Sequence, residues 1–212
     1  MSDIDMHLVK FDENGLVPVI VQDSTSAEVL MAAWANEEAL RLTALGGELT
    51  FWSRSRKELW KKGETSGNVM RVIELRIDCD GDTLLAIVEA SGPACHTGKR
   101  TCFHRSLWGK ENSTEATFLG RLWRFMNIRK SESPEESYTA RLIAQGPSRV
   151  AQKVGEEGVE TAIAAATGDR ESFRYEAADL LYHLLAACIS SGVTFNEVLG
   201  ELMSRHKKDD DR

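Results

Sequence analysis

The sequence has no apolar run long enough to cross a membrane. Its uninterrupted apolar runs, such as residues 162–166 and 184–189, fall far below the ~18 consecutive apolar residues of a membrane-spanning helix. The first residues are acidic and lack the basic segment, apolar stretch and small-residue cleavage site of a secretory signal. We therefore expect no membrane contact and a cytoplasmic location.

An excess of positive charge is also missing. The formal net charge is -7 at pH 7, and the field of an acidic protein repels phosphate groups. We therefore expect no nucleic-acid partner, and a phosphorylated small molecule would need a local basic patch. Hydrophobic residues make up 42% of the chain and charged residues 28%, which is typical of a globular protein and excludes a disordered or fibrous one.

Cysteine is scarce, and its distribution is uneven. Three of the four cysteines, Cys79, Cys95 and Cys102, lie close together in the sequence, whereas Cys188 stands in an apolar run. In a reducing compartment such a cluster indicates a metal site or a redox pair rather than a disulfide framework. Cys188 is expected to be buried as a small hydrophobic residue.

The first half of the chain reads mostly as β-structure. Up to about residue 107, β-branched and alternating segments predict strands at residues 16–21, 69–77 and 84–89. Apolar residues at helical spacing predict one helix over residues 28–45, after hydroxyl residues that are suited to cap it.

The second half has a helical pattern instead. Apolar periodicity predicts helices at residues 117–129, 134–145, 147–167, 170–192 and 194–207. Short connections between such helices are typical of an antiparallel bundle, and the polar, glycine-containing segment between the two halves has the composition of a linker. We predict two domains, an α+β, mostly β domain at residues 1–108 and an all-α helical bundle at residues 115–212, joined by a linker at 109–114.

Potential metal ligands cluster in the first half. Asp78, Asp80 and Asp82 surround Cys79 in a predicted turn between two strands, and Cys95 and Cys102 follow in a glycine-containing loop. Three thiolates suit zinc and leave its fourth position for a water with a pKa of about 7, whereas carboxylates suit magnesium. Alternatively, the aspartates only solvate the turn and the cysteines form a structural zinc clip.

Two histidines accompany these cysteines. His96 and His104 each lie beside or near a predicted ligand, and imidazole titrates near neutrality. Both are candidates for catalytic acid, catalytic base or metal ligand, and both are equally suited to orient a neighbouring metal ligand.

Residues 51–68 combine basic, aromatic and hydroxyl side chains. Guanidinium groups bind phosphate bidentately and tryptophan faces can stack on a base, so this segment is a candidate anion cradle. Its predicted substrate-binding residues are Trp52, Arg54, Arg56, Lys61, Thr65 and Ser66. The alternative is a solvated basic helix with tryptophans in the core.

Acidic residues repeat at helical spacing in the second half. Glu157 and Glu160 lie three apart on one predicted helix, and Glu176 and Asp179 repeat that spacing on the next. Two such pairs on facing helices suit a magnesium cluster that neutralises phosphate oxygens and orients a water. Lys153 is a candidate phosphate ligand and Glu156 a candidate catalytic base; the alternative is ordinary surface glutamates.

Several motifs of the first half, taken together, resemble the phosphoribosyl-AMP cyclohydrolases. They are residues 31–40, 51–56, 59–67, 78–82 and 92–98. The resemblance implies magnesium at the three aspartates of the turn and zinc at Cys79, Cys95 and Cys102, in a homodimer whose zinc site is shared between the subunits. The implied reaction is hydrolytic opening of the six-membered purine ring of phosphoribosyl-AMP.

The second half resembles another family, the phosphoribosyl-ATP pyrophosphatases of the all-α nucleotide pyrophosphohydrolase superfamily. The motifs are residues 150–163 and 176–185. The resemblance implies magnesium at Glu157, Glu160, Glu176 and Asp179, with Glu156 as a fifth ligand or base, and release of diphosphate from phosphoribosyl-ATP.

The two resemblances occur in the order of a known bifunctional enzyme of histidine biosynthesis. Two rival functions remain at this point. One is a zinc-stabilised interaction module without catalysis, and the other is a general nucleoside triphosphate pyrophosphohydrolase in the helical half.

Overall fold

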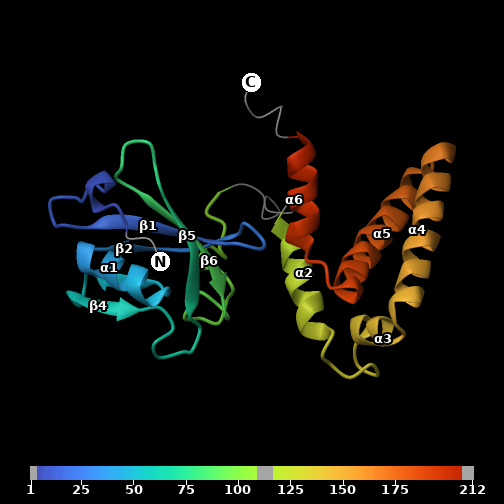
Figure 1. The fold of residues 1–212 in the computed structure, drawn as a ribbon, viewed down its shortest axis with the longest axis horizontal. Coiled ribbons are helices and arrows are strands. Elements are labelled where there is room, and N and C mark those ends of the chain that lie inside the picture. The colour runs from blue at the N-terminus through green and yellow to red at the C-terminus, as the bar shows by residue number, and fades with distance from the viewer. Residues whose placement is uncertain (1–3, 109–116, 207–212) are drawn as a thin grey trace. The chain divides into compact units, whose positions relative to one another are not determined.

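The computed structural model describes residues 4–108 and 117–206. The chain divides into two compact units, Met1–Phe118 and Leu119–Arg212. The predicted linker at residues 109–114 lies outside the described residues. The N-terminal unit is mostly β and the C-terminal unit is helical (Figure 1), which confirms the expected pair of fold classes.

One mixed sheet organises the N-terminal unit. Within residues 4–108, its six strands are β1 (Val17–Asp23), β2 (Val29–Ala35), β3 (Thr50–Ser53), β4 (Glu58–Lys61), β5 (Met70–Ile77) and β6 (Leu84–Ala90). Their order across the sheet is β4-β3-β2-β1-β6-β5. The β1–β6 pair is parallel, and the other neighbours are antiparallel.

The core of this unit follows the alternation of the strands. Val17, Val19 and Val21 of β1 are buried at every second position, as expected when one face of a sheet is covered. Helix α1 (Glu37–Gly46) contributes Ala39 and Leu40 to the same core. Burial of this apolar surface anchors the strands whose ends and loops bear the predicted ligands.

The predicted helix over residues 28–45 is wrong in its first half. Residues 29–35 form β2, which pairs with β1 from Val17↔Ala35 onward. The helix begins only after Asn36, whose side chain accepts a hydrogen bond from the Ala39 N–H at 2.8 Å. The apolar residues of this segment fit the period of a helix as well as that of a strand. The segment forms a strand because it pairs with β1 on one side and β3 on the other.

The C-terminal unit consists of helices within residues 117–206. They are α2 (Phe118–Arg129), α3 (Tyr138–Ala144), α4 (Pro147–Thr167), α5 (Arg170–Ser191) and α6 (Phe195–His206). Helices α4 and α5 form a long hairpin (Figure 1). None of the described helices is by itself long and apolar enough to cross a membrane; only α5 and α6, bent by 108° at their break, meet that test together.

The predicted helix over residues 134–145 starts later than expected. Residues 134–136 form a turn, and the Ser137 side chain caps α3 by accepting a hydrogen bond from the Ala140 N–H at 3.3 Å. The helices share a small core around Met126, Leu142 and Leu185. This core holds the α4–α5 hairpin, which presents the predicted acidic residues.

Candidate active sites

The turn between β5 and β6 gathers three carboxylates. Asp78, Asp80 and Asp82 each offer an oxygen within 4.8 Å of the others, and all three are exposed. Asp78 Oδ1 also accepts hydrogen bonds from three backbone N–H groups of the turn, at 3.0 to 3.1 Å. Burial opposes ionisation of Asp78, but these bonds lower its pKa. The set of hard oxygen donors fits magnesium.

A tight loop holds Cys95 close to Cys102. The Cys95 N–H donates to the Lys99 carbonyl at 3.1 Å, and the Thr97 hydroxyl donates to the Cys95 sulfur at 3.1 Å. The bond from Thr97 lowers the pKa of the Cys95 thiol, whereas partial burial and the neighbouring Cys95 raise that of Cys102. Each thiol affects the pKa of the other, so the two lie close together, and a thiol pair is a donor set that fits zinc.

Cys79 stands apart from this thiol pair. It is exposed on the β5–β6 turn, between Asp78 and Asp80. Among the described residues, the groups of three potential ligands are all acidic, and none contains a cysteine. A single chain therefore brings together two of the three predicted zinc ligands.

The two histidines differ in how firmly they are held. His104 Nδ1 lies 3.1 Å from the Thr101 carbonyl oxygen, so this nitrogen carries the proton and, in the neutral ring, Nε2 remains a free acceptor. His96 Nδ1 lies 4.0 Å from the Cys95 sulfur. Both rings are exposed beside the thiol pair, which keeps both candidate roles open.

Sequence reasoning missed a buried cation at this site, Lys62. It is 7% exposed, and its Nζ donates to the Asn68 carbonyl at 3.4 Å. Burial lowers its pKa, although the nearby Cys102 and Cys95 act in the opposite direction. The predicted neighbour Lys61 instead forms a surface ion pair with Glu48. Lys62 lies in the turn directly after β4, where its N–H donates to the Leu49 carbonyl at 2.9 Å.

The predicted anion cradle is formed by two strands and a loop rather than a helix. The Arg54 guanidinium lies 4.5 Å from the centre of the Trp34 ring, and Trp34 pairs with Trp52 across β2 and β3. Arg56 forms an exposed ion pair with Glu58 at 3.1 Å. Arg54 thus lies over an aromatic surface, while Arg56 and Lys61 have acidic partners.

The hydroxyl residues of the cradle lie next to the cysteine loop. Thr65 and Ser66 are exposed between β4 and β5. This segment abuts the cysteine loop because Ser91 N–H donates to the Val69 carbonyl at 3.0 Å. A Cβ added to Gly92 would lie 2.2 Å from the Asn68 Oδ1 atom, so a larger residue there would require the Asn68 side chain to move.

In the C-terminal unit, α4 and α5 bring carboxylates together. Glu157, Glu176 and Asp179 each offer an oxygen within 4.8 Å of the others. The pKa of Glu176 is raised by burial and then by the nearby charges of Glu160 and Glu157. The structure therefore brings three of the four predicted ligands together, with Glu160 close enough to act on Glu176 by its charge. The mutual repulsion of these carboxylates favours a bound divalent cation.

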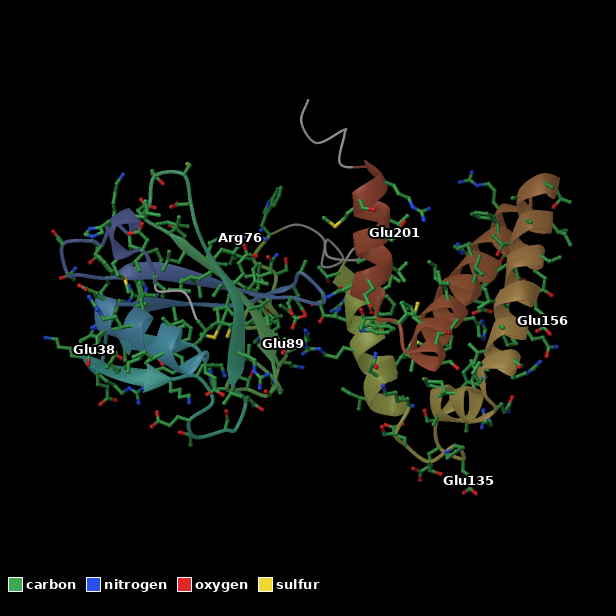
Figure 2. All side chains as sticks on the ribbon, viewed as in Figure 1. Glu38, Arg76, Glu89, Glu135, Glu156 and Glu201 are labelled. Atoms are coloured by element: carbon green, nitrogen blue, oxygen red, sulfur yellow. The ribbon has the colours of Figure 1, made fainter. Side chains whose placement is uncertain are left out.

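Lys153 lies beside this cluster and contacts two glutamates. Its Nζ lies 2.8 Å from an oxygen of Glu156 and 2.8 Å from Glu157 Oε1, and both partners raise its pKa. Glu156 extends from α4 (Figure 2) and also accepts a hydrogen bond from Gln152 at 2.8 Å. The three-carboxylate group thus excludes Glu156, whose predicted role as a base or fifth ligand remains a prediction.

A buried histidine behind the cluster was not predicted. His183 is 4% exposed, and its Nδ1 lies 2.8 Å from the Asp179 carbonyl oxygen and 3.7 Å from Glu157 Oε1. Since the carbonyl only accepts, Nδ1 donates and the neutral ring accepts from the Tyr138 hydroxyl at Nε2, 3.0 Å away. Its position four residues after Asp179, on the same face of the helix, is the sequence feature that could have identified it.

The repulsion between Glu176 and its acidic neighbours predicts how the stability of the protein depends on pH. The pKa of Glu176 is raised in the folded state. The protonated Glu176 side chain therefore adds to the free energy of unfolding at low pH, and this contribution is lost as the pH rises through the folded-state pKa. In the presence of a chelator at pH 7, Glu176→Gln is therefore expected to unfold at a higher temperature than the wild type. The difference should vanish at acidic pH, where Glu176 is protonated.

Thermal unfolding of both proteins in chelator measures this difference. Glu171→Gln is the control, because Glu171 is exposed in the first turn of the same helix. A Glu176→Gln variant no more stable than the wild type at pH 7 would contradict the crowding of these charges.

Comparison with known proteins covers both units. The family model described as phosphoribosyl-AMP cyclohydrolase matches residues 31–104, and that described as phosphoribosyl-ATP pyrophosphohydrolase matches residues 119–206. The chain is similar to the histidine biosynthesis bifunctional protein HisIE of Photobacterium profundum, with 47% identity over 195 residues that cover 92% of this chain and 94% of the relative. The protein of the same name from Aquifex aeolicus is 47% identical over 202 residues, covering 94% and 98%.

Proposed function

The chain belongs to the HisIE family of bifunctional histidine-biosynthesis enzymes, and from that premise we propose that each of its activities depends on a separate metal centre. The helical unit hydrolyses phosphoribosyl-ATP to phosphoribosyl-AMP and diphosphate, and the β unit then opens the adenine ring of phosphoribosyl-AMP. Neither the interaction module nor the general triphosphate hydrolase is favoured by these matches.

For the helical unit we propose magnesium bound by Glu157, Glu160, Glu176 and Asp179. The observation that carries this proposal is the convergence of the Glu157, Glu176 and Asp179 oxygens from α4 and α5 within 4.8 Å of one another. Magnesium would supply positive charge against the phosphate oxygens of phosphoribosyl-ATP. Lys153 adds a cation beside the cluster and is proposed to bind the same phosphates, and His183 holds the α5 backbone at Asp179.

For the β unit we propose zinc bound by Cys95 and Cys102. Zinc would supply an acidified water for attack on the purine ring. The third thiol is proposed to be the partner subunit's Cys79, in a homodimer, because Cys79 of one chain does not join the pair. His104, whose free Nε2 faces no described protein partner, and His96 are proposed to handle protons.

The remaining N-terminal site residues are proposed to bind phosphoribosyl-AMP and a second cation. Asp78, Asp80 and Asp82 fit magnesium. Arg54 and Trp52 lie on the aromatic side of the cradle, and Thr65 and Ser66 lie on the loop that abuts the thiols. We propose that these groups hold the phosphates and base. The cytoplasm, where such nucleotides are made and used, is the proposed location.

Metal reconstitution tests the two-centre proposal. Treatment with a strong chelator is expected to abolish both activities. Zinc with magnesium should restore ring opening of supplied phosphoribosyl-AMP, whereas magnesium alone should restore only diphosphate release from phosphoribosyl-ATP. Full ring opening by protein shown by elemental analysis to contain no zinc would overturn the zinc assignment, and diphosphate release unaffected by chelator would overturn the magnesium assignment.

A further inference from the structure

Arg100 connects the cysteine loop to a buried acidic turn. The Arg100 Nη2 atom lies 3.1 Å from Asp23 Oδ2, and Nε donates to Glu28 Oε2 at 2.8 Å. The Asp23 side chain is 0% exposed and that of Glu28 is 12% exposed. Because these charges are largely removed from water, breaking one of these ion pairs typically costs more than breaking an ion pair on the surface.

The acceptor of this contact is itself fixed. Asp23 Oδ1 accepts hydrogen bonds from the Thr25 N–H at 3.1 Å, the Ser26 N–H at 2.9 Å and the Ser26 hydroxyl at 3.0 Å. These bonds hold the carboxylate in the turn between β1 and β2. The guanidinium therefore binds to a rigid point of the sheet rather than to a mobile side chain.

Arg100 also lies where the two arms of the cysteine loop meet. Its backbone carbonyl accepts from the Ala94 N–H at 2.9 Å, next to Cys95. On its other side, the Thr101 hydroxyl donates to the Val29 carbonyl at 2.7 Å, and the Cys102 N–H donates to the Leu30 carbonyl at 2.8 Å. Both thiols thus depend on the same short segment for their position.

We propose that Arg100 is a positioning residue that fixes the spacing of the Cys95 and Cys102 thiols for metal binding, through its ion pairs with Asp23 and Glu28. The proposal rests on the zinc centre proposed above and extends it to residues that do not touch the metal. A loop fixed before the metal arrives loses less conformational freedom on binding. Groups that orient metal ligands typically change metal affinity by about 10- to 100-fold.

Zinc affinity, measured by competition with a chromophoric chelator, tests this role in the full-length protein. Arg100→Met keeps the aliphatic stem and is expected to weaken zinc binding by about 10- to 100-fold. Glu28→Ala should weaken it less, because the Asp23 contact remains. Arg100→Lys should recover part of the loss, since a single ammonium cannot reproduce the planar fork that reaches both carboxylates.

Lys99→Met is the matched control, because it removes one positive charge from the same loop at an exposed position. It should leave zinc affinity unchanged. If Arg100→Met fails to fold, Glu28→Ala decides by the same measurement.

Unfolding temperatures with and without zinc separate positioning from a merely structural role. A structural role lowers both temperatures and leaves zinc affinity intact, which would overturn the proposal. Positioning reduces the increment that zinc adds. A wild-type protein that binds no zinc would overturn the zinc centre itself and the role of Arg100 with it, whereas normal zinc binding by all the variants would overturn the role of Arg100 alone.

Discussion

Cys102→Ala is expected to reduce ring opening of phosphoribosyl-AMP by about 10³-fold or more while leaving diphosphate release intact. The substitution removes one of the two thiols that a single chain brings together. Without zinc, the attacking water loses an acidification of several pKa units, from 15.7 to about 7. Steady-state rates with each supplied substrate measure the two activities separately.

A second cysteine variant serves as the control for Cys102→Ala. Cys188 is buried in α5 and belongs to neither proposed centre. Cys188→Ala removes a thiol from the chain and should retain ring opening. Equal loss of ring opening in both variants would show that the effect of Cys102→Ala is not specific to the thiol pair.

Glu157→Gln is expected to have the opposite pattern, with diphosphate release reduced by about 10²- to 10³-fold and ring opening of supplied phosphoribosyl-AMP retained. Glu157 is the buried member of the carboxylate cluster, at 4% exposure, and it contacts both Lys153 and His183. The amide keeps the shape of the side chain and removes the charge that a divalent cation requires.

Two measurements support the interpretation of Glu157→Gln. Binding of manganese, a spectroscopic substitute for magnesium, should weaken together with activity. Glu171→Gln, an exposed change at the start of α5, should affect neither. Wild-type manganese affinity in Glu157→Gln would remove Glu157 from the metal site.

The long helices were predictable because their ends carry local signals. The predicted helix at residues 147–167 agrees with α4, which has Pro147 in its first turn and is followed by Gly168 with φ of +72°. Helix α5 is likewise followed by Gly192, with φ of +69°. Proline near the start and glycine just past the end are energetically suited to helix termini, so no tertiary information was needed.

Strand β2 was not predictable in the same way. Its run of apolar residues satisfies a helical period, and only the neighbouring β1 and β3 make it a strand. The segment 51–68 presents the same difficulty, since its two short strands pair with each other through contacts such as Phe51↔Trp60. In both cases the decisive energy comes from pairing and burial that a local pattern does not contain.

Among the site residues, too, those placed by local spacing were predictable, and those that depend on partners distant in the sequence were not. Spacing placed Glu157, Glu160, Glu176 and Asp179 on facing helices, and the structure brings the oxygens of Glu157, Glu176 and Asp179 together. Arg100 and His183 act through partners that are distant in the sequence, at Asp23 and Tyr138. Their importance depends on burial beside a charged or polar group, which motif spacing does not reveal.

Complementation between two inactive variants tests the central claim most directly. Cys102→Ala and Glu157→Gln, each supplied alone with phosphoribosyl-ATP, zinc and magnesium, should form almost no ring-opened product. Their mixture should form it, because the phosphoribosyl-AMP released by the helical unit of one variant is the substrate for the β unit of the other. A mixture as inactive as its components, or loss of both activities through either substitution, would contradict two separate metal centres.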